Sequence, residues 1–223
     1  MELEVYSIKG SKTDRKITLA DTVFGIEPND HAIYLDVKQF MANKRQGTHS
    51  AKEKSAVSGS TRKLKKQKGT GGARAGSIKN PLYRGGARAG SIKNPLYRGG
   101  ARVFGPHPRD YNFKLNKKLK KLARLSALTY KAQDNNIIVL EDFTFETPKT
   151  KNFIELLTSF QLAGEKTLLV MANTEPNVIL SSRNLKKVRI VRASDLNTYE
   201  ILDAKRLLIT ESSMKDIEVI HQN

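Results

Sequence analysis

The stretch TLLVMANTEPNVILSSRNLKKVRIVRA, residues 167–193, decides the fold class. It opens with an apolar run, "TLLVMAN", and closes with a second run rich in β-branched residues, "VRIVRA". The segment between the two runs has Pro176 near its start, where a helix accepts proline. Two short apolar strands on either side of a helix are typical of a β-α-β unit with parallel strands. This stretch therefore predicts an α/β fold.

The same alternation continues on both sides of this stretch. Further strands are predicted at "NIIVLE" (136–141) and "RLLITES" (206–212), and further helices at 147–164 and 213–222. Apolar strands of four to six residues between helices imply a mostly parallel sheet that helices cover on both faces. The N-terminal residues 1–43 are expected to join this domain, because neither flank is large on its own.

Two more helices are predicted from apolar spacing. "NDHAIYLDVKQFMANKR" has Asn29 or Asp30 as its N-cap and an apolar face made of Ile33, Val37, Phe40 and Met41. The helix at 114–131 has lysines on one face and leucines on the other, at positions Leu115, Leu119, Leu122, Leu125 and Leu128. A basic amphipathic helix can lie on a membrane. The aliphatic face without tryptophan favours a core helix whose outer face contacts RNA.

Charge is segregated along the chain, which has 223 residues and a net charge of +18. Residues 44–132 carry 24 of the 40 lysines and arginines but only two acids, Glu53 and Asp110. In the rest of the chain, acids outnumber bases by four. A near-neutral domain interrupted by a strongly cationic insert indicates a polyanionic partner.

The cationic insert cannot form a core of its own. From Gly47 to Arg102 helical and strand periodicity disappear, and large apolar residues are sparse. Such a segment cannot offset its ordering entropy by burial, so we expect it to become ordered on a partner. We predict one α/β domain made of residues 1–43 and 105–223, and an extended loop over residues 44–104.

The loop contains an exact repeat. Residues 71–84 and 85–98 are identical at all fourteen positions: each reads "GGARAGSIKNPLYR", within the run "GGARAGSIKNPLYRGGARAGSIKNPLYRGGAR" at 71–102. Identity without any drift indicates a recent tandem duplication. The second copy adds three cations, Arg88, Lys93 and Arg98.

Several classes of protein are excluded by what the sequence lacks. The chain has no cysteine, which removes disulfides and thiolate metal sites and favours a reducing compartment. The charged start "MELEVYSIKGSK" predicts no signal peptide, and no run reaches eighteen apolar residues. We therefore expect a soluble, cytoplasmic protein that does not bind membranes.

The residues that could carry catalysis are not organised for it. Ser77 stands where a phosphate-binding P-loop needs lysine, and no strand precedes that glycine-rich segment. The four histidines are far apart and have no metal-ligand spacing. Asp142 and Glu146 follow a strand, where charged residues are usually solvated. We predict a protein that is not an enzyme and has no metal and no cofactor.

The insert does contain the chemistry of nucleic-acid binding. "RKLKKQKGTGGARAGS" (62–77) combines dense cations with glycines, whose backbone can approach phosphates closely. The alternative is a disordered basic linker. The aromatic residues of the segment offer stacking surfaces for bases and favour RNA: Tyr83, Tyr97, Phe104 and Tyr111.

These motifs resemble the family of the bacterial large-subunit ribosomal protein conventionally numbered four. Its pattern of Arg-Gln-Gly-Thr, Gln-Lys-Gly-Thr-Gly, Ala-Arg-x-Gly-Ser and proline followed by an aromatic is matched at Arg45–Thr48, Gln67–Gly71, Ala73–Ser77 and Pro81–Tyr83. Two further segments, Thr147–Lys151 and Arg183–Val188, also resemble the family's sequence pattern. The resemblance spans the whole chain.

The resemblance implies an rRNA-binding constituent of the large ribosomal subunit that acts early in 50S assembly. Its loop would contact several domains of 23S rRNA and line the polypeptide exit tunnel. The implied partners are 23S rRNA, neighbouring large-subunit proteins and the nascent polypeptide. An alternative is a free regulatory protein that binds mRNA and represses its own operon.

The residues predicted to bind RNA are the cations of the loop and its base, with the polar and glycine residues of the matched motifs. They are Lys44, Arg45, Gln46, Thr48, His49, Arg62, Lys63, Lys65, Lys66, Gln67, Lys68, Gly69, Thr70, Gly71, Arg74, Ser77, Lys79, Tyr83, Arg84, Arg88, Lys93, Arg98, Arg102, Arg109, Lys114, Lys117 and Lys118.

The chain departs from the family pattern in two ways. Many members have Pro-Trp before the Gln-Lys-Gly-Thr-Gly run, where this chain has Leu64-Lys65. The family also has one copy of the unit at 71–84. One hypothesis is that the second copy perturbs the tunnel wall and alters the action of macrolides, and the alternative is a harmless bulge.

Overall fold

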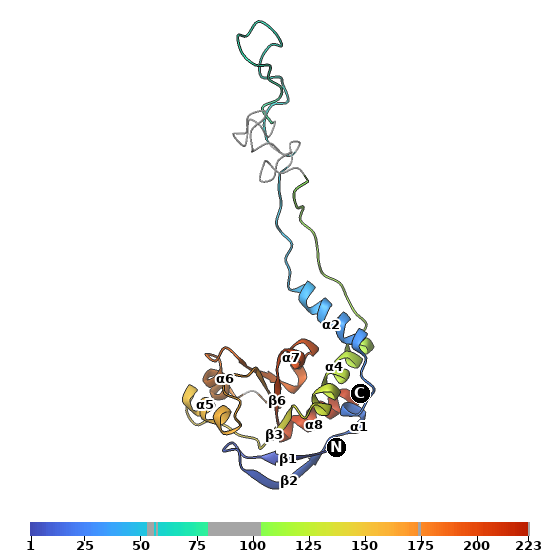
Figure 1. Ribbon diagram of the computed structural model, residues 1–223, viewed down its shortest axis with the longest axis vertical. Helices are drawn as coiled ribbons and strands as arrows, with labels where there is room; N and C mark the ends of the chain where they lie inside the picture. The colour runs from blue at the N-terminus through green and yellow to red at the C-terminus, as the bar shows by residue number, and fades with distance from the viewer. Residues whose placement is uncertain (53–55, 57, 80–103, 174, 223) are drawn as a thin grey trace. The chain divides into compact units, whose positions relative to one another are not determined.

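The computed structural model describes residues 1–52, 56, 58–79, 104–173 and 175–222, with side chains up to residue 220 (Figure 1). Two compact units are present: the α/β unit, made of Met1–Lys44 and Asn112–Asn223, and the arm, Arg45–Tyr111. The α/β unit contains the strands and helices, in the order β1 (Glu2–Tyr6), β2 (Lys12–Thr18), α1 (Asp21–Phe24), α2 (Asp30–Asn43), α4 (Lys117–Gln133), β3 (Ile137–Leu140), α5 (Thr150–Ser159), β4 (Thr167–Met171), α6 (Pro176–Ser182), β5 (Val188–Arg192), the 3-10 helix η1 (Ala193–Asp195), α7 (Thr198–Asp203), β6 (Arg206–Thr210) and α8 (Glu211–Gln222).

The strands form one six-stranded sheet in the order β2-β1-β3-β6-β4-β5 (Figure 1). All neighbours pair in parallel except β1 and β2, which are antiparallel. The registers place Val139 beside Val5 on one side and beside Ile209 on the other. The prediction of an α/β fold with a mostly parallel sheet is therefore confirmed.

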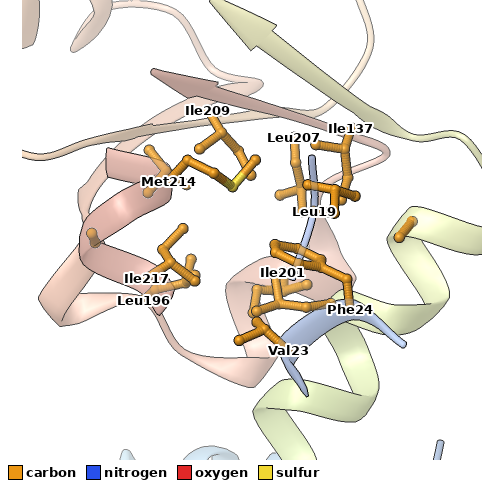
Figure 2. Packing of buried hydrophobic residues seen from close by; sticks show 14 of the residues in the cluster. Leu19, Val23, Phe24, Ile137, Leu196, Ile201, Leu207, Ile209, Met214 and Ile217 are labelled. Carbon is orange, nitrogen blue, oxygen red and sulfur yellow. The ribbon is translucent and has the colours of Figure 1, made fainter. Parts of the chain in front are cut away.

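Helices cover both faces of this sheet. Side chains of successive strand residues point to opposite faces, and Val139 and Leu140 accordingly belong to two different apolar clusters. The first cluster takes its helical residues from α1, α4, α7 and α8, and includes Leu128 of α4. Figure 2 shows Phe24 and Ile201 in this cluster. The second cluster takes them from α5 and α6. Parallel strands that are buried on both faces explain the apolar runs seen in the sequence.

Truncation of Leu128 is expected to destabilise the α/β unit strongly. Leu128 is fully buried in the first cluster, and a leucine-to-alanine change at such a site costs about 2–5 kcal/mol. Chemical denaturation of Leu128→Ala measures the loss. The matched control is Leu180→Ala, whose side chain is 47% exposed and should cost less than about 0.5 kcal/mol. Equal losses for the two variants would contradict the assignment of the core.

Four elements were not predicted: β2, which is polar, and α1, η1 and α7, which are three to six residues long. β2 has the sequence KTDRKIT and pairs only with β1 at the edge of the sheet, where charged residues are normal and apolar alternation is not required. α7 is six residues long, and the Asn197 side chain caps it by accepting from the backbone N–H of Glu200 at 2.9 Å. Neither segment has the apolar periodicity on which the sequence-based assignment depended.

α2 shows one confirmed prediction and one error. Asn29, not Asp30, is the N-cap, because its side chain accepts from the backbone N–H of Ala32 at 2.9 Å. Ala32 and Gln39 are the buried residues of the helix, whereas Met41 is 56% exposed. Gln39 is polar but can be buried on the inner face of α2, because its side-chain Nε2 donates to the Phe113 carbonyl at 2.7 Å. Placing Met41 on the apolar face was therefore wrong.

Helix ends also differ from expectation. α4 begins at Lys117 rather than at residue 114, so that Leu115 precedes the helix, and it extends to Gln133. α5 covers ten residues and ends at Ser159, before Gln161, which has a φ of 56°. Within the described residues, no helix is long and apolar enough to cross a membrane.

Candidate nucleic-acid interface

The two chain segments at the base of the arm are joined by backbone hydrogen bonds. The N–H of Arg109 donates to the Gly47 carbonyl at 3.1 Å, and the N–H of Ala51 donates to the Pro106 carbonyl at 2.9 Å. Gly47 has a φ of 65°, and a Cβ at this position would overlap the Arg109 carbonyl and the Tyr111 ring. The approach of the two segments therefore requires glycine at position 47.

Gly47→Ala is expected to disrupt the base of the arm and leave the α/β unit folded. The new Cβ would have to displace the backbone at Arg109, and the positive φ adds strain. Amide chemical shifts of Arg109 and Tyr111 should change, while those of the β3 and β6 residues should not. Unchanged arm resonances would contradict the proposed packing at Gly47.

Two arginines lie over the ring of Tyr111. The guanidinium carbon of Arg45 lies 4.0 Å from the centre of the Tyr111 ring, and that of Arg109 lies 4.2 Å from it. Cation–π attraction fixes both groups, and their remaining N–H groups stay available to phosphates.

Farther along the arm, a short pairing brings two basic segments together. Lys63 and Ser77 form an isolated antiparallel bridge, and the N–H of Leu64 donates to the Gly76 carbonyl at 3.1 Å. Ala75 is buried, at 6% exposure. A hollow of about 600 Å³ lies beside this pairing, and its lining combines cations with apolar side chains: Ser60, Arg62, Lys63, Leu64, Lys65, Lys66 and Ile78.

The glycines of "QKGTGG" allow the chain to turn within this region. Gly69 and Gly71 have φ values of 76° and 64°, and a Cβ at either position would meet no atom within 4 Å. Glycine is therefore favoured at these positions by the positive φ and not by a lack of space for a side chain. Lys68 and Thr70 beside them are exposed, and Gln67 accepts a hydrogen bond from Lys63.

The described cations of this region have no carboxylate partner. No ion pair of the described residues involves the side chains Arg62, Lys63, Lys65, Lys66, Lys68, Arg74 or Lys79. Like charges this close together repel one another, so a polyanion would stabilise the arrangement.

Many cations of the α/β unit are neutralised within the unit. Arg15 pairs with both Glu141 and Glu211, and Lys166 lies 2.5 Å from Asp203. Further pairs are Lys12 with Glu4, Arg189 with Glu200, and Lys205 with Glu165. Hydrogen bonding to Lys12 lowers the pKa of the Glu4 carboxyl. The two units therefore use their cations in different ways.

The first turns of α4 and the segment before them are an exception in the α/β unit. The lysines there have no ion-pair or hydrogen-bond partner among the described residues, and they are Lys114, Lys117, Lys118, Lys120 and Lys121. The sequence-based set of RNA-binding residues contained the first three and missed Lys120 and Lys121. Lys120 and Lys121 lie on the lysine face of the predicted helix, and that position could have added them to the set of residues predicted to bind RNA.

Two other cations of α4 serve the fold. Burial lowers the pKa of the Arg124 guanidinium, and the nearby Asp36 carboxylate opposes this shift. Burial likewise lowers the pKa of the Lys131 ammonium, which donates to the Ala204 carbonyl at 2.7 Å. Lys44 is also engaged, because its ammonium lies 4.1 Å from the centre of the Phe40 ring.

The predicted RNA-binding residues are thus distributed over several places. The arm's base contains Arg45, Gln46, Thr48, His49 and Arg109, of which the structure joins Arg45 and Arg109 through Tyr111. The residues from Arg62 to Lys79 lie around the Lys63–Ser77 bridge. Six others fall outside the described residues: Tyr83, Arg84, Arg88, Lys93, Arg98 and Arg102. Contact with RNA remains a prediction for the whole set.

An α/β unit with a long insert whose described cations lack carboxylate partners is typical of proteins that bind polyanions. The described residues contain no assembled catalytic centre. Residues 17–88 and 84–220 match the Ribosomal protein L4/L1 family, and the chain belongs to that family. The two matched ranges meet at the junction of the repeated units. The tandem duplication itself stays a prediction.

Full-length relatives support this assignment. The chain is 57% identical over 220 residues to the large ribosomal subunit protein uL4 of Phocaeicola vulgatus, covering 99% of both chains. It is 56% identical over 218 residues to the uL4 protein of Christiangramia forsetii, covering 98% of both, and 56% identical over 223 residues to that of Parabacteroides distasonis, covering 100% of this chain and 99% of the relative. Family membership confirms the prediction that the chain is not an enzyme.

Proposed function

We propose that this protein is a constituent of the large ribosomal subunit in the cytoplasm and that it binds 23S rRNA mainly through its arm. Its full-length similarity to proteins named large ribosomal subunit protein uL4 supports the structural role. The unpaired cations around the Lys63–Ser77 bridge are the single observation that carries the RNA-binding role. Phosphates are the partners that such cations lack within the chain.

The arrangement of the arm suits a segment that enters folded RNA. The hollow is lined by the apolar side chains of Leu64 and Ile78, on which a base or ribose could pack, and by cations that could reach its phosphate. The Arg45–Tyr111–Arg109 stack fixes two guanidinium groups at the arm's base. The α/β unit then provides a stable fold, and the arm makes most of the RNA contacts.

The wider role follows from the family. We propose that the protein joins the subunit early in assembly, that its loop contacts several domains of 23S rRNA, and that the end of the loop lines the polypeptide exit tunnel, beside neighbouring proteins and the nascent chain. The second copy of the repeated unit would then lengthen the part of the chain nearest the tunnel.

Sedimentation of cell lysates tests the proposal. We expect nearly all of the protein to migrate with large subunits and their precursors in a sucrose gradient. A substantial free pool that binds the leader of its own mRNA would instead support the alternative of a regulatory RNA-binding protein. A chain that migrates with neither would contradict both roles.

A further inference from the structure

We propose that α2 presents a second RNA-binding surface, the α2 stripe, formed by His31, Tyr34, Lys38 and Met41. This inference rests on the proposed binding of rRNA and adds a site on the α/β unit, apart from the arm. None of these four residues belongs to the set predicted from the sequence. The stripe would stack on unpaired bases and contact phosphates.

Most of α2 is not buried. Only Ala32 and Gln39 of the fourteen residues of α2 are buried. Tyr34 is 58% exposed and Met41 is 56% exposed, and both rank among the most exposed large apolar side chains of the described residues. Spacings of three, four and three residues place the four members of the stripe on one face of the helix. At 100° per residue, the centre of that face lies about 130° around the helix from Ala32 and Gln39.

The side chains of the stripe lie close to one another. The rings of His31 and Tyr34 are nearly parallel, with an angle of 24° and centres 6.4 Å apart. The Lys38 ammonium lies 5.6 Å from the centre of the Tyr34 ring. An aromatic surface with a cation at its side is what bases and phosphates of single-stranded RNA require together. Met41 adds a flexible apolar side chain to the same surface.

The two carboxylates of α2, Asp30 and Asp36, lie outside the stripe and accept hydrogen bonds from other elements of the α/β unit. Asp30 accepts from the Tyr130 hydroxyl at 2.7 Å, and Asp36 accepts from the Thr198 hydroxyl at 2.5 Å. The stripe itself consists of rings, a thioether and a lysine. Lys38 gives it a positive charge that can pair with a phosphate, beside rings on which a base can stack.

Photo-crosslinking in assembled large subunits tests where the stripe lies. A photoreactive phenylalanine derivative at position 34 should crosslink to rRNA, and the same derivative at position 219 of α8 serves as the control. Val219 is 59% exposed, so the reactive group is accessible at both positions. Crosslinking of position 34 to a protein neighbour, or to nothing, would overturn the proposal.

Binding measurements on the full chain test the contribution of the stripe. Tyr34→Ala combined with Lys38→Gln should weaken binding to 23S rRNA roughly 5- to 50-fold, because one stacked base and one phosphate contact are lost. Tyr34→Phe should retain nearly all of the affinity. The control is Val219→Ala with Lys215→Gln, an exposed pair with the same spacing on α8, which should bind as the unchanged protein does.

The outcomes separate this inference from the proposed function. If the unchanged protein fails to bind rRNA, the proposed function is wrong. If the unchanged protein binds and the Tyr34/Lys38 variant binds equally well, the stripe alone is wrong. Thermal unfolding of each variant shows whether the fold is intact, which we expect because both side chains lie at the surface.

Discussion

Raising the salt concentration from about 50 to 200 mM should weaken binding of the isolated protein to 23S rRNA by roughly 10⁴- to 10⁵-fold. The arm and the start of α4 supply many cations that lack partners among the described residues, and each phosphate that they neutralise releases counterions. For about ten phosphate contacts, log K should fall with log salt at a slope of roughly −7 to −9. Filter binding at several salt concentrations measures this slope.

A slope near about −2 would contradict the assignment of the arm as the main contact surface, because it corresponds to only two or three neutralised phosphates. Thermal unfolding recorded at the lowest and highest salt concentrations is the control. Both samples should show the same cooperative transition, so that a change in affinity reflects binding and not unfolding.

Excision of residues 59–102 should leave a folded α/β unit and reduce the affinity for rRNA by more than about 10³-fold at low salt. Nearly all buried apolar residues of the described chain belong to the α/β unit, and Ala75 is the exception in the arm. The hydrogen bonds between Gly47 and Arg109 and between Ala51 and Pro106 lie outside the excised range. The globular part should therefore unfold in a single transition.

A second variant separates charge from chain length. In it, residues 59–102 are replaced by a glycine-serine linker of equal length, which restores the loop without its cations. We expect this variant to bind as weakly as the excised chain. Recovery of the affinity would show that the cations are dispensable, and loss of the cooperative transition in either variant would contradict the independence of the α/β unit.

The fold could be predicted where burial leaves a pattern in the sequence. β3, β4 and β6 are apolar because both of their faces are covered, and their positions followed from that. β2 is polar and lies at the edge of the sheet, and α7 is only six residues long although its Ile201 is buried, so neither gave such a signal. The inner face of α2 was misjudged because Gln39, a polar residue, occupies it through a hydrogen bond to Phe113, which is distant in sequence.

The candidate site shows the same division. Charge counts isolated the arm, because segregation of cations is visible in composition alone. The Arg45–Tyr111–Arg109 stack was not predicted, since it joins residues more than sixty positions apart and depends on the chain's return along the arm. The ion pairs could not be predicted either, because partners such as Arg15 and Glu211 are distant in sequence and come together only when the sheet has formed.

The central claim is that the arm's cations bind RNA while the paired cations of the α/β unit serve the fold, and matched charge variants test it most directly. One variant replaces Arg62, Lys65, Lys66 and Lys68 with glutamine. The other replaces Lys12, Lys166, Arg189 and Lys205, which are paired with carboxylates. We expect the salt slope to become shallower by about 3 in the first variant and to stay within about 0.5 of the unchanged protein in the second. Equal changes in the two variants, or a larger change in the second, would contradict the claim.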